Sequence, residues 1–326
     1  MAMELEGTPA FDSAWGRTFR GFGTTVGVWA TNPTIVDRLE GMLRLWVDRV
    51  EAVASRFRED SDISRANAAA GSPVAVSREL LRAVDAACRM ADATLGLCDP
   101  TVGNAVIGAG YDRSFELVEA AGPGPRQPPR PGGAWRRVVV DHGTATLTVP
   151  EGCRRGLGGS AQGWAVDSFL ARLRLGILYA NPDLGVCVSA GGDLAVAGRP
   201  PGAGWTVTVQ ERLDGDDPDA EDLLLTRGAM ATSGATARRW GSGVSAGHHV
   251  VDPRTGTPGR SCWRLVTVFS SSCLVADTAA TAAWLLAEDA PHWLAEQGLA
   301  ARLVHEGGRA VYVGDVDRWV RPEAQA

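Results

Sequence analysis

A carboxylate and a hydroxyl four residues apart form the pair in this chain that is best suited to binding a metal. Asp277 and Thr281 lie in an alanine-rich stretch, Val275 to Leu286, whose composition favours a helix. Residues at positions i and i+4 share one face of a helix. Two oxygen ligands there suit a hard cation such as Mg²⁺, which keeps water and substrate phosphates as further ligands. The alternative is that the acid only caps the N-terminus of this helix.

Two adjacent histidines, His248 and His249, are the second candidate. They precede the sequence Val-Val-Asp-Pro-Arg-Thr-Gly, which ends at Gly256 and whose second half is typical of a turn. An imidazole at the end of a strand can face a pocket, and it titrates near neutral pH, as a general base requires. A surface pair of histidines without a chemical role is the alternative interpretation.

Two glycine-containing segments match known motifs only in part. The segment from Arg155 to Gly163 contains the G-x-G-x-x-A pattern of dinucleotide-binding loops, but polar residues precede it where that fold needs a buried strand. The segment from Gly243 to Gly247 matches the G-x-S-x-G nucleophile elbow, but its flanking residues do not predict a strand before it and a helix after it. We therefore disfavour a Rossmann dehydrogenase and a serine hydrolase. The backbone amides of a glycine turn before a helix could still bind a phosphate.

The composition excludes further classes of protein. The 326 residues include 32 basic ones, all of them arginine, and 38 acidic ones, which gives a net charge of −6 without a basic stripe. This balance argues against nucleic-acid binding, and the lack of lysine excludes Schiff-base and P-loop enzymes. None of the 6 cysteines forms a C-x-x-C pair, so a structural zinc site is disfavoured. Residues 1–6 contain no apolar stretch and no apolar run approaches ~18 residues, so we expect a cytoplasmic protein without membrane contact.

The elements that must position these residues follow from the periodicity of the apolar side chains. A helical period predicts helices over 33–57, 77–95, 160–173 and 275–286. Thr34 and Ser77 are the expected N-caps of the first two helices, and Gly96 is expected to end the second. The predicted strands are Phe19–Trp29, Val138–Val140, Ala145–Val149, Gly185–Ser189, Trp205–Val209 and Arg309–Val313. Helices and strands are mixed without a regular βαβ alternation or an internal repeat, which predicts an α+β fold.

We predict a single domain over residues 18–320, between an N-terminal tail of residues 1–17 and a C-terminal tail of residues 321–326. The stretch 121–134 is the one linker-like loop, because its prolines exclude helix and sheet. The acidic stretch from Asp214 to Asp222 is predicted to be a solvated loop.

Short sequence blocks in a fixed order give this chain a family resemblance. In chain order the blocks are Gly23-Thr24, Ser55 to Asn67, Asp99 to Gly103, Leu157 to Asp167, Ala190 to Asp193, Thr232 to Gly234, His249 to Gly256 and Ala276 to Ala282. Together they resemble the FAD:protein FMN transferase family, the ApbE-like flavin transferases, over roughly residues 19–285. The resemblance implies a single α+β domain of mixed sheets and packed helices with a nucleotide pocket.

The resemblance also implies a reaction and the residues that carry it. FAD would be cleaved in the presence of Mg²⁺, its FMN half would be joined through the phosphate to a Thr or Ser of an acceptor protein, and AMP would leave. Asp277, Thr281 and the backbone carbonyl of Gly159 would hold the metal. His249 and Asp277 would be the catalytic residues, with His249 near the reacting phosphate. The residues that would bind the flavin nucleotide are Phe22, Phe57, Asp99, Thr101, Val102, Gly103, Gly156, Gln162, Gly192, Asp193, Val250 and Val251.

Three of the nucleotide-binding positions depart from the family pattern. Phe22 stands where the family has Met, Gly156 where it has Asp and Gln162 where it has Lys. The chain has therefore lost a carboxylate and an ammonium group together, which leaves a neutral pair. Two alternatives to a transferase follow: a non-catalytic FAD-binding or flavin-delivery protein, and a metal-dependent FAD pyrophosphatase that releases FMN and AMP to water.

The partners that the resemblance implies are FAD, used as a substrate, and an acceptor protein with a Thr or Ser flavinylation site. We expect neither nucleic acid nor a membrane among the partners. The family's acceptor motif ends in Ser/Thr-Gly-Ala-Thr, which Ser233 to Thr236 matches. That motif begins with Asp, where this chain has Met230, so we interpret the match as part of the Thr-Ser-Gly block rather than as a site of self-flavinylation.

Overall fold

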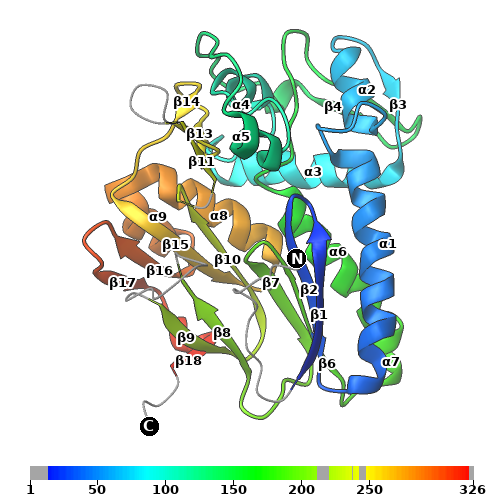
Figure 1. The fold of residues 1–326 in the computed structure, drawn as a ribbon, viewed down its shortest axis with the longest axis vertical. Coiled ribbons are helices and arrows are strands. Elements are labelled where there is room, and N and C mark those ends of the chain that lie inside the picture. The colour runs from blue at the N-terminus through cyan, green and yellow to red at the C-terminus, as the bar shows by residue number, and fades with distance from the viewer. Residues whose placement is uncertain (1–13, 211–219, 237, 242–246, 323–326) are drawn as a thin grey trace.

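An antiparallel sheet forms the centre of the computed structural model, which describes residues 14–210, 220–236, 238–241 and 247–322. Its eight strands follow the order β1-β2-β6-β7-β10-β15-β16-β17 (Figure 1), and all neighbouring pairs are antiparallel. The α+β prediction is therefore confirmed. A Rossmann fold is excluded, because it needs a parallel sheet. The strands are Trp15–Gly21 (β1), Thr24–Ala30 (β2), Gly185–Ala190 (β6), Asp193–Gly198 (β7), Gly228–Gly234 (β10), Trp263–Ser270 (β15), Ala300–His305 (β16) and Ala310–Val313 (β17).

Helices cover one face of this sheet. They are Val36–Ala54 (α1), Ala161–Arg174 (α6), Cys273–Leu286 (α8) and Ala290–Glu296 (α9), and Arg78–Ala93 (α3) packs against α1 and α6. The indole N–H of Trp46 in α1 donates to the carbonyl oxygen of Ala165 in α6 at 2.9 Å. α6 and α8 lie so close that a Cβ added to Gly163 would be 2.8 Å from the Cα of Leu274. No residue but glycine fits at that contact, so Gly163 sets the spacing of the two helices.

A second sheet covers the opposite face of the large one. Its strands are Trp205–Val209 (β8), Glu221–Leu225 (β9) and Val320–Pro322 (β18), in the order β18-β9-β8. Trp29, Trp205 and Phe269 pack in one cluster between the two sheets, each at most 6% exposed. Because the large sheet is buried on both faces, β6 is buried along its whole length and shows no alternation of apolar and polar residues.

Short elements gather at the top of Figure 1. They are Asp62–Ala68 (α2), Gly103–Gly108 (α4), Phe115–Ala121 (α5), Val74–Ala75 (β3), Val139–Asp141 (β4), Thr146–Thr148 (β5), Arg239–Trp240 (β11), Gly247–His248 (β12), Val251–Asp252 (β13) and Thr257–Pro258 (β14). Trp240 in β11 contacts the segment that follows α4. Its indole N–H donates to the carbonyl oxygen of Ala109 at 3.1 Å, and its ring lies 5.4 Å from that of Tyr111. Elsewhere lie Pro33–Ile35 (η1), Trp135–Arg137 (η2), Ile177–Ala180 (α7), Ala287–Asp289 (η4) and Val316–Arg318 (η5).

The helices with the clearest apolar period are confirmed. α3 begins after Ser77, whose hydroxyl oxygen accepts a hydrogen bond from the N–H of Leu80 at 3.3 Å. The chain leaves this helix at Gly96, which has a φ of 85° that favours glycine. The predicted cap of the first helix is wrong: the side chain of Asn32, two residues before Thr34, caps the 3-10 turn that leads into α1.

Two strand predictions are wrong. Phe19–Trp29 is not one strand but most of a hairpin, whose turn consists of Phe22 and Gly23 with φ values of 55° and 66°. The strand at Ala310–Val313 is not the last one, because β18 follows it. Residues 214–219 of the predicted acidic loop lie outside the described residues, and the stretch ends inside β9.

The strands run past the predicted domain limits. β1 begins at Trp15 and β18 ends at Pro322, so the limits at residues 18 and 320 fall within strands. The Pro-rich stretch contains neither helix nor strand from residue 122 to residue 134, as its prolines predict. Within the part of the chain that the structure describes, no helix is both long and apolar enough to span a bilayer.

Candidate functional site

Two turns at one end of the large sheet bring several predicted nucleotide-binding residues together. Phe22 lies in the β1–β2 turn, and Gly192 and Asp193 lie where β6 turns into β7. The two turns are neighbours, because β2 pairs with β6 and the N–H of Gly191 donates to a β2 carbonyl oxygen at 2.9 Å. Gln162, in the first turn of α6, places its amide nitrogen 3.4 Å from the position that a Cβ on Gly191 would take.

Phe22 adopts a left-handed backbone conformation that aromatic residues rarely adopt, with a φ of 55°. Its N–H donates to Oε1 of Glu51 in α1 at 2.7 Å, which holds the turn against that helix. A left-handed conformation costs of order 1 kcal/mol for a residue with a side chain. The half-buried ring of Phe22 is therefore held at this end of the sheet by its surroundings rather than by its own preference.

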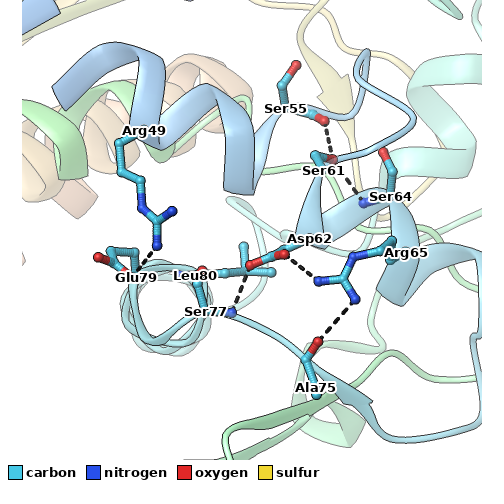
Figure 2. A network of polar contacts seen from close by, with 10 residues as sticks. All are labelled: Arg49, Ser55, Ser61, Asp62, Ser64, Arg65, Ala75, Ser77, Glu79 and Leu80. Atoms are coloured by element: carbon cyan, nitrogen blue, oxygen red, sulfur yellow. Dashed lines mark hydrogen bonds and ion pairs between the residues drawn. The ribbon is translucent and has the colours of Figure 1, made fainter. Parts of the chain in front are cut away.

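Hydrogen bonds at the start of α2 close the loop that carries Phe57 (Figure 2). The hydroxyl of Ser61, the N-cap of α2, donates to the carbonyl oxygen of Ser55 at 2.7 Å and accepts from the N–H of Ser64 at 3.1 Å. Asp62 accepts a further hydrogen bond from the backbone N–H of the α3 N-cap at 2.8 Å. These contacts fix both ends of the loop, so the Phe57 ring is presented from a well-defined turn.

Asn67 ties the same segment to the glycine turn before α6. Its side-chain amide donates to the carbonyl oxygen of Arg155 at 3.0 Å, and its Oδ1 accepts from the Arg155 N–H at 2.8 Å. The next residue, Gly156, donates its N–H to the carbonyl oxygen of Pro100 at 3.0 Å. A Cβ added to Gly103 would lie 2.5 Å from the carbonyl oxygen of residue 154. Three separate sequence blocks therefore meet at this turn.

Asp99 and Thr101 direct their side chains into the protein. One carboxylate oxygen of Asp99 accepts from the N–H and the hydroxyl of Thr101 at 2.7 and 2.6 Å, and the other accepts from the N–H of Gly133. The Thr101 hydroxyl accepts from the N–H of Ala134 at 3.2 Å. These bonds fasten the 99–103 loop to the end of the Pro-rich loop. We therefore assign the two side chains a positioning role.

The predicted valines also pack into the interior. Val250 lies in the apolar cluster under α8, whereas Val251 lies in a smaller cluster with Trp240. Each of the two valines is 6% exposed. Val102 is partly buried against the cluster that contains Val251. A nucleotide beside these three residues would therefore contact mainly their backbone atoms and not their side chains.

Arg56 lies among the predicted nucleotide-binding residues. Its guanidinium carbon is 4.1 Å from the ring centroid of Phe57 and 4.7 Å from that of Tyr111. Its Nη2 donates to the carbonyl oxygen of Tyr111 at 2.8 Å. The two rings lie 5.7 Å apart, and Phe57 is 42% exposed. The guanidinium group and the rings form a partly exposed stack.

The predicted metal-binding side chains lie on α8. Asp277 is 7% exposed, and its Oδ2 has no hydrogen-bond partner within the described residues. Burial raises the pKa of Asp277 to about 7; the N–H of Gly163 lowers it and the charge of Asp167 raises it. One turn later, the hydroxyl of Thr281 shares a hydrogen bond of 2.9 Å with that of Ser233 in β10. The i and i+4 spacing on one helix face is confirmed.

The carbonyl oxygen of Gly159, the third predicted ligand, accepts a hydrogen bond from the thiol of Cys98 at 3.2 Å. Burial raises the pKa of this thiol, and the charge of Asp277 raises it further. An unpartnered carboxylate oxygen, a hydroxyl and a carbonyl suit a hard cation. Among the described residues, no three His, Cys, Asp or Glu side chains could hold a metal together. A cation here would therefore need carbonyl, hydroxyl, water and substrate oxygens.

Asp193 connects the nucleotide-binding turns to the metal-binding side chains. Burial and then the charge of Asp277 raise its pKa well above the ordinary value, while the charge of Arg238 and the N–H of Thr232 lower it. The side chain is 6% exposed. The charge of a predicted metal-binding residue therefore affects the ionisation of a predicted nucleotide-binding residue.

His249 is half-buried, and its Nδ1 is buried without a partner within the described residues. Burial lowers the pKa of His249 to about 3, and the charges of Arg238 and His248 lower it further. Burial therefore favours the neutral form of the His249 imidazole. His248 donates from Nε2 to the carbonyl oxygen of Gly259 at 3.0 Å, so this histidine is held within the fold. Residues 243–246 of the predicted nucleophile elbow lie outside the described residues.

A cavity of about 320 Å³ lies at the opposite end of β2 and β6 from the two turns. It is lined by Thr31, Asn32, Pro33, Ile35, Asn181, Asp183 and Leu184. None of these residues is a predicted site residue, and we assign the cavity no role in the chemistry.

Sequence reasoning missed four residues of the site: Arg56, Cys98, Tyr111 and Arg238. Arg56 directly precedes Phe57 and Cys98 directly precedes Asp99, so their neighbours in the sequence blocks could have marked them. Tyr111 and Arg238 have no such signal. Packing between segments far apart in the sequence brings these two residues to the site.

Comparisons with known sequences agree with this arrangement. The sequence model of the ApbE family matches residues 22–303. The FAD:protein FMN transferase of Vibrio cholerae is 27% identical to this chain over 285 residues, which cover 82% of this chain and 80% of that protein. The FAD:protein FMN transferase of Haemophilus influenzae is 25% identical over 290 residues, which cover 85% of this chain and 80% of that protein.

Solved structures give the same fold. The ApbE protein of Thermotoga maritima matches with a TM-score of 0.78 at 26% identity, over 94% of this chain and 99% of that one. The flavin transferase ApbE of Vibrio cholerae matches with a TM-score of 0.71 at 24% identity, over 94% and 99% of the two chains. The single α+β domain expected from the sequence blocks is thereby confirmed.

Proposed function

Because this chain belongs to the ApbE family, we propose that it is an FAD:protein FMN transferase, which moves FMN from FAD to a Thr or Ser of an acceptor protein and releases AMP. The observation that carries the proposal is the family match over residues 22–303. In support, residues of separate sequence blocks, including Phe57, Gly103 and Gly156, lie in segments that are hydrogen-bonded to one another. In the reaction, the acceptor oxygen bonds to the FMN phosphorus, the diphosphate bridge breaks, and the hydroxyl proton passes to a base.

Asp277, Thr281 and the carbonyl oxygen of Gly159 would hold Mg²⁺. The unpartnered Oδ2 of Asp277 supports this assignment, because a buried carboxylate oxygen without a partner is costly. When bound, Mg²⁺ would neutralise charge on phosphate oxygens, which is a main part of catalysis in phosphoryl transfer. Asp193, next to Asp277, would keep this side of the site acidic.

His249 would take the proton of the acceptor hydroxyl. In the ligand-free protein its pKa is lowered by burial and by the charge of Arg238, which makes it a weak base. An anion bound beside Arg238 would offset that charge and raise the pKa of the imidazole. His249 would then become an effective base only when a nucleotide is in place.

The two alternatives from the sequence differ from the transferase in a single step. The neutral Gly156 and Gln162 favour a protein that binds FAD without cleaving it. A pyrophosphatase would use the same metal-binding residues but water as the acceptor. The buried, unpartnered carboxylate of Asp277 supports catalysis over binding alone.

One experiment separates the three functions. The purified chain is incubated with FAD and Mg²⁺, with and without a peptide that carries Asp-Gly-Ala-Thr-Gly-Ala-Thr, and AMP release and the mass of the peptide are followed. A peptide that gains the mass of the FMN group, with one AMP per transfer, is the expected result. Free FMN with an unmodified peptide identifies a pyrophosphatase, and bound FAD without AMP identifies a flavin-binding protein. A chain that binds no FAD contradicts all three.

A further inference from the structure

We propose that Arg56 is a binding residue for the phosphate groups of FAD. This inference rests on the proposed function. Gly156 and Gln162 are neutral, and Arg56 would supply the positive charge that these two residues of the proposed nucleotide site lack. The inference also gives a role to a half-buried guanidinium group beside the predicted nucleotide-binding loops.

The guanidinium group of Arg56 has no acidic partner within the described residues. Its hydrogen bond there goes to a neutral acceptor, the carbonyl oxygen of Tyr111, at 2.8 Å. The charge of Asp112 raises the pKa of Arg56. The Oδ1 of Asp112, however, pairs with Nε of Arg113 at 3.0 Å. An arginine has five N–H donors in a planar fork, so most of the donors of Arg56 are available to a ligand.

Two aromatic rings and one hydrogen bond restrain this fork. The guanidinium carbon lies 4.1 and 4.7 Å from the ring centroids of Phe57 and Tyr111, and Nη2 donates to the Tyr111 carbonyl oxygen. A planar fork matches two phosphate oxygens, which accept two parallel hydrogen bonds. A guanidinium group that is already restrained loses less freedom when a ligand binds.

Arg56 borders the glycine turn at the N-terminus of α6. A Cβ added to Gly156 would lie 3.8 Å from the Cδ of Arg56 and 4.0 Å from the Cα of Gly103. The stem of Arg56 thus runs beside two predicted nucleotide-binding glycines. Phosphates at this turn could also meet the backbone N–H groups of a helix start.

The charge of a second arginine, Arg238, acts on Arg56. Burial lowers the pKa of Arg56 to about 10, the charges of Tyr111 and Asp112 raise it, and the charge of Arg238 lowers it. The charge of Arg238 also reaches His249 and Asp193. An anion bound at Arg56 would offset the charge of Arg56 and reduce the effect of Arg238 on it. The diphosphate of FAD carries such a charge.

The test is calorimetric titration of the full chain with FAD and with riboflavin, which has no phosphate, at several salt concentrations. The variants are Arg56→Gln, Arg56→Lys and the control Arg58→Gln. Arg58 lies in the same loop but is exposed and pairs with Asp60 at 2.9 Å. Thermal unfolding of each variant checks that the fold is retained.

We expect Arg56→Gln to weaken FAD binding roughly 10- to 100-fold, as for a lost charged hydrogen bond, and to leave riboflavin binding unchanged. In the same variant, the salt dependence of FAD binding should decrease. Arg56→Lys should retain part of the affinity that Arg56→Gln loses. Arg58→Gln should bind FAD like the wild type. Equal weakening of FAD and riboflavin, or unchanged FAD binding, overturns the inference and leaves the proposed function standing. A wild-type chain that binds no FAD overturns the proposed function itself.

Discussion

The two sides of the candidate site carry opposite electrostatic imbalances. The acidic side consists of Asp193 and Asp277, whose pKa values are raised by burial, and Asp277 has an oxygen without a partner in the described part of the chain. The basic side consists of Arg56, Arg238 and His249, and burial lowers the pKa values of Arg56 and His249. Among the described residues, Asp277 has no cation and Arg56 has no carboxylate as a direct partner.

This difference indicates which ligand completes the site. A metal ion alone would compensate the acidic side and add to the charge near Arg238, whereas a phosphate alone would compensate the basic side and repel Asp193. A nucleotide together with a metal ion compensates both sides at once. Buried charges that lack partners cost several kcal/mol each, so we expect the metal and the dinucleotide to bind cooperatively.

Asp277→Asn removes the ionised group of the acidic side and has the largest expected effect. Turnover of FAD in the presence of Mg²⁺ should fall by ~10³-fold or more, because the carboxylate that would hold the metal is lost. AMP release measures this, and Asp289→Asn, an exposed acid just beyond α8, is the control. Turnover that stays Mg²⁺-dependent at the wild-type rate would contradict the metal assignment.

His249→Gln changes how stability depends on pH on the basic side. The pKa of His249 is about 3 in the folded protein and 6.5 in the unfolded chain, so the unfolded chain binds an extra proton between these values. The titration of His249 should therefore contribute a fall in stability of about 1.4 kcal/mol per pH unit as the pH drops below 6.5, whereas Asp277, with its pKa raised to about 7, contributes in the opposite direction.

In His249→Gln that slope should be smaller, as measured by urea unfolding at pH 6.5, 5.5 and 4.5. His292, whose side chain is 81% exposed, provides the control variant His292→Gln. A slope identical to that of the wild type would mean that His249 is not the neutral imidazole described above.

Gly156→Asp places an acid on the basic side. The new carboxylate would reach Arg56, since the Cβ position lies 3.8 Å from Cδ of that residue. FAD affinity should fall by about 10-fold, because the cation would be paired within the protein. In the double variant Gly156→Asp/Arg56→Gln, FAD affinity should be little lower than in the Arg56→Gln variant. Additive losses of affinity would mean that the two positions act independently.

Ser61→Ala loosens the loop that carries the basic side and has the smallest expected effect. Loss of an N-cap hydroxyl should cost about 1 kcal/mol of unfolding free energy. FAD affinity should fall only slightly, since Phe57 and Arg56 remain. Chemical denaturation measures the stability, and Ser64→Ala in the same helix is the control. Equal stability of the two variants would argue against the cap.

The sequence predicts the fold best where one face of an element meets solvent. α3 has a polar face, an N-cap serine and a terminal glycine, and each of these features is present in the structure. The central strands β7, β10, β15 and β16 were not predicted. They are buried between helices and the second sheet, so they lack the alternation by which a half-exposed strand is identified.

The sequence predicts the segments of the site better than the direction of each side chain. The blocks around Phe57, Gly156 and Asp277 do come together, but Asp99 and Thr101 point inward to hold their loop. Tyr111 and Arg238 could not be placed from the sequence, because packing between segments far apart along the chain brings them to the site. The pKa of His249 likewise depends on burial, which a local motif does not reveal.

The glycine contact between α6 and α8 has a consequence for how this site can evolve. Gly163 fixes the distance between the helix that carries Gln162 and the helix that carries Asp277, and a larger residue would separate them. Positions 56, 156 and 162 lie outside that contact. Substitutions at these positions can therefore change the charge of the proposed nucleotide site while the spacing of α6 and α8, and with it that of the proposed metal-binding groups, is kept.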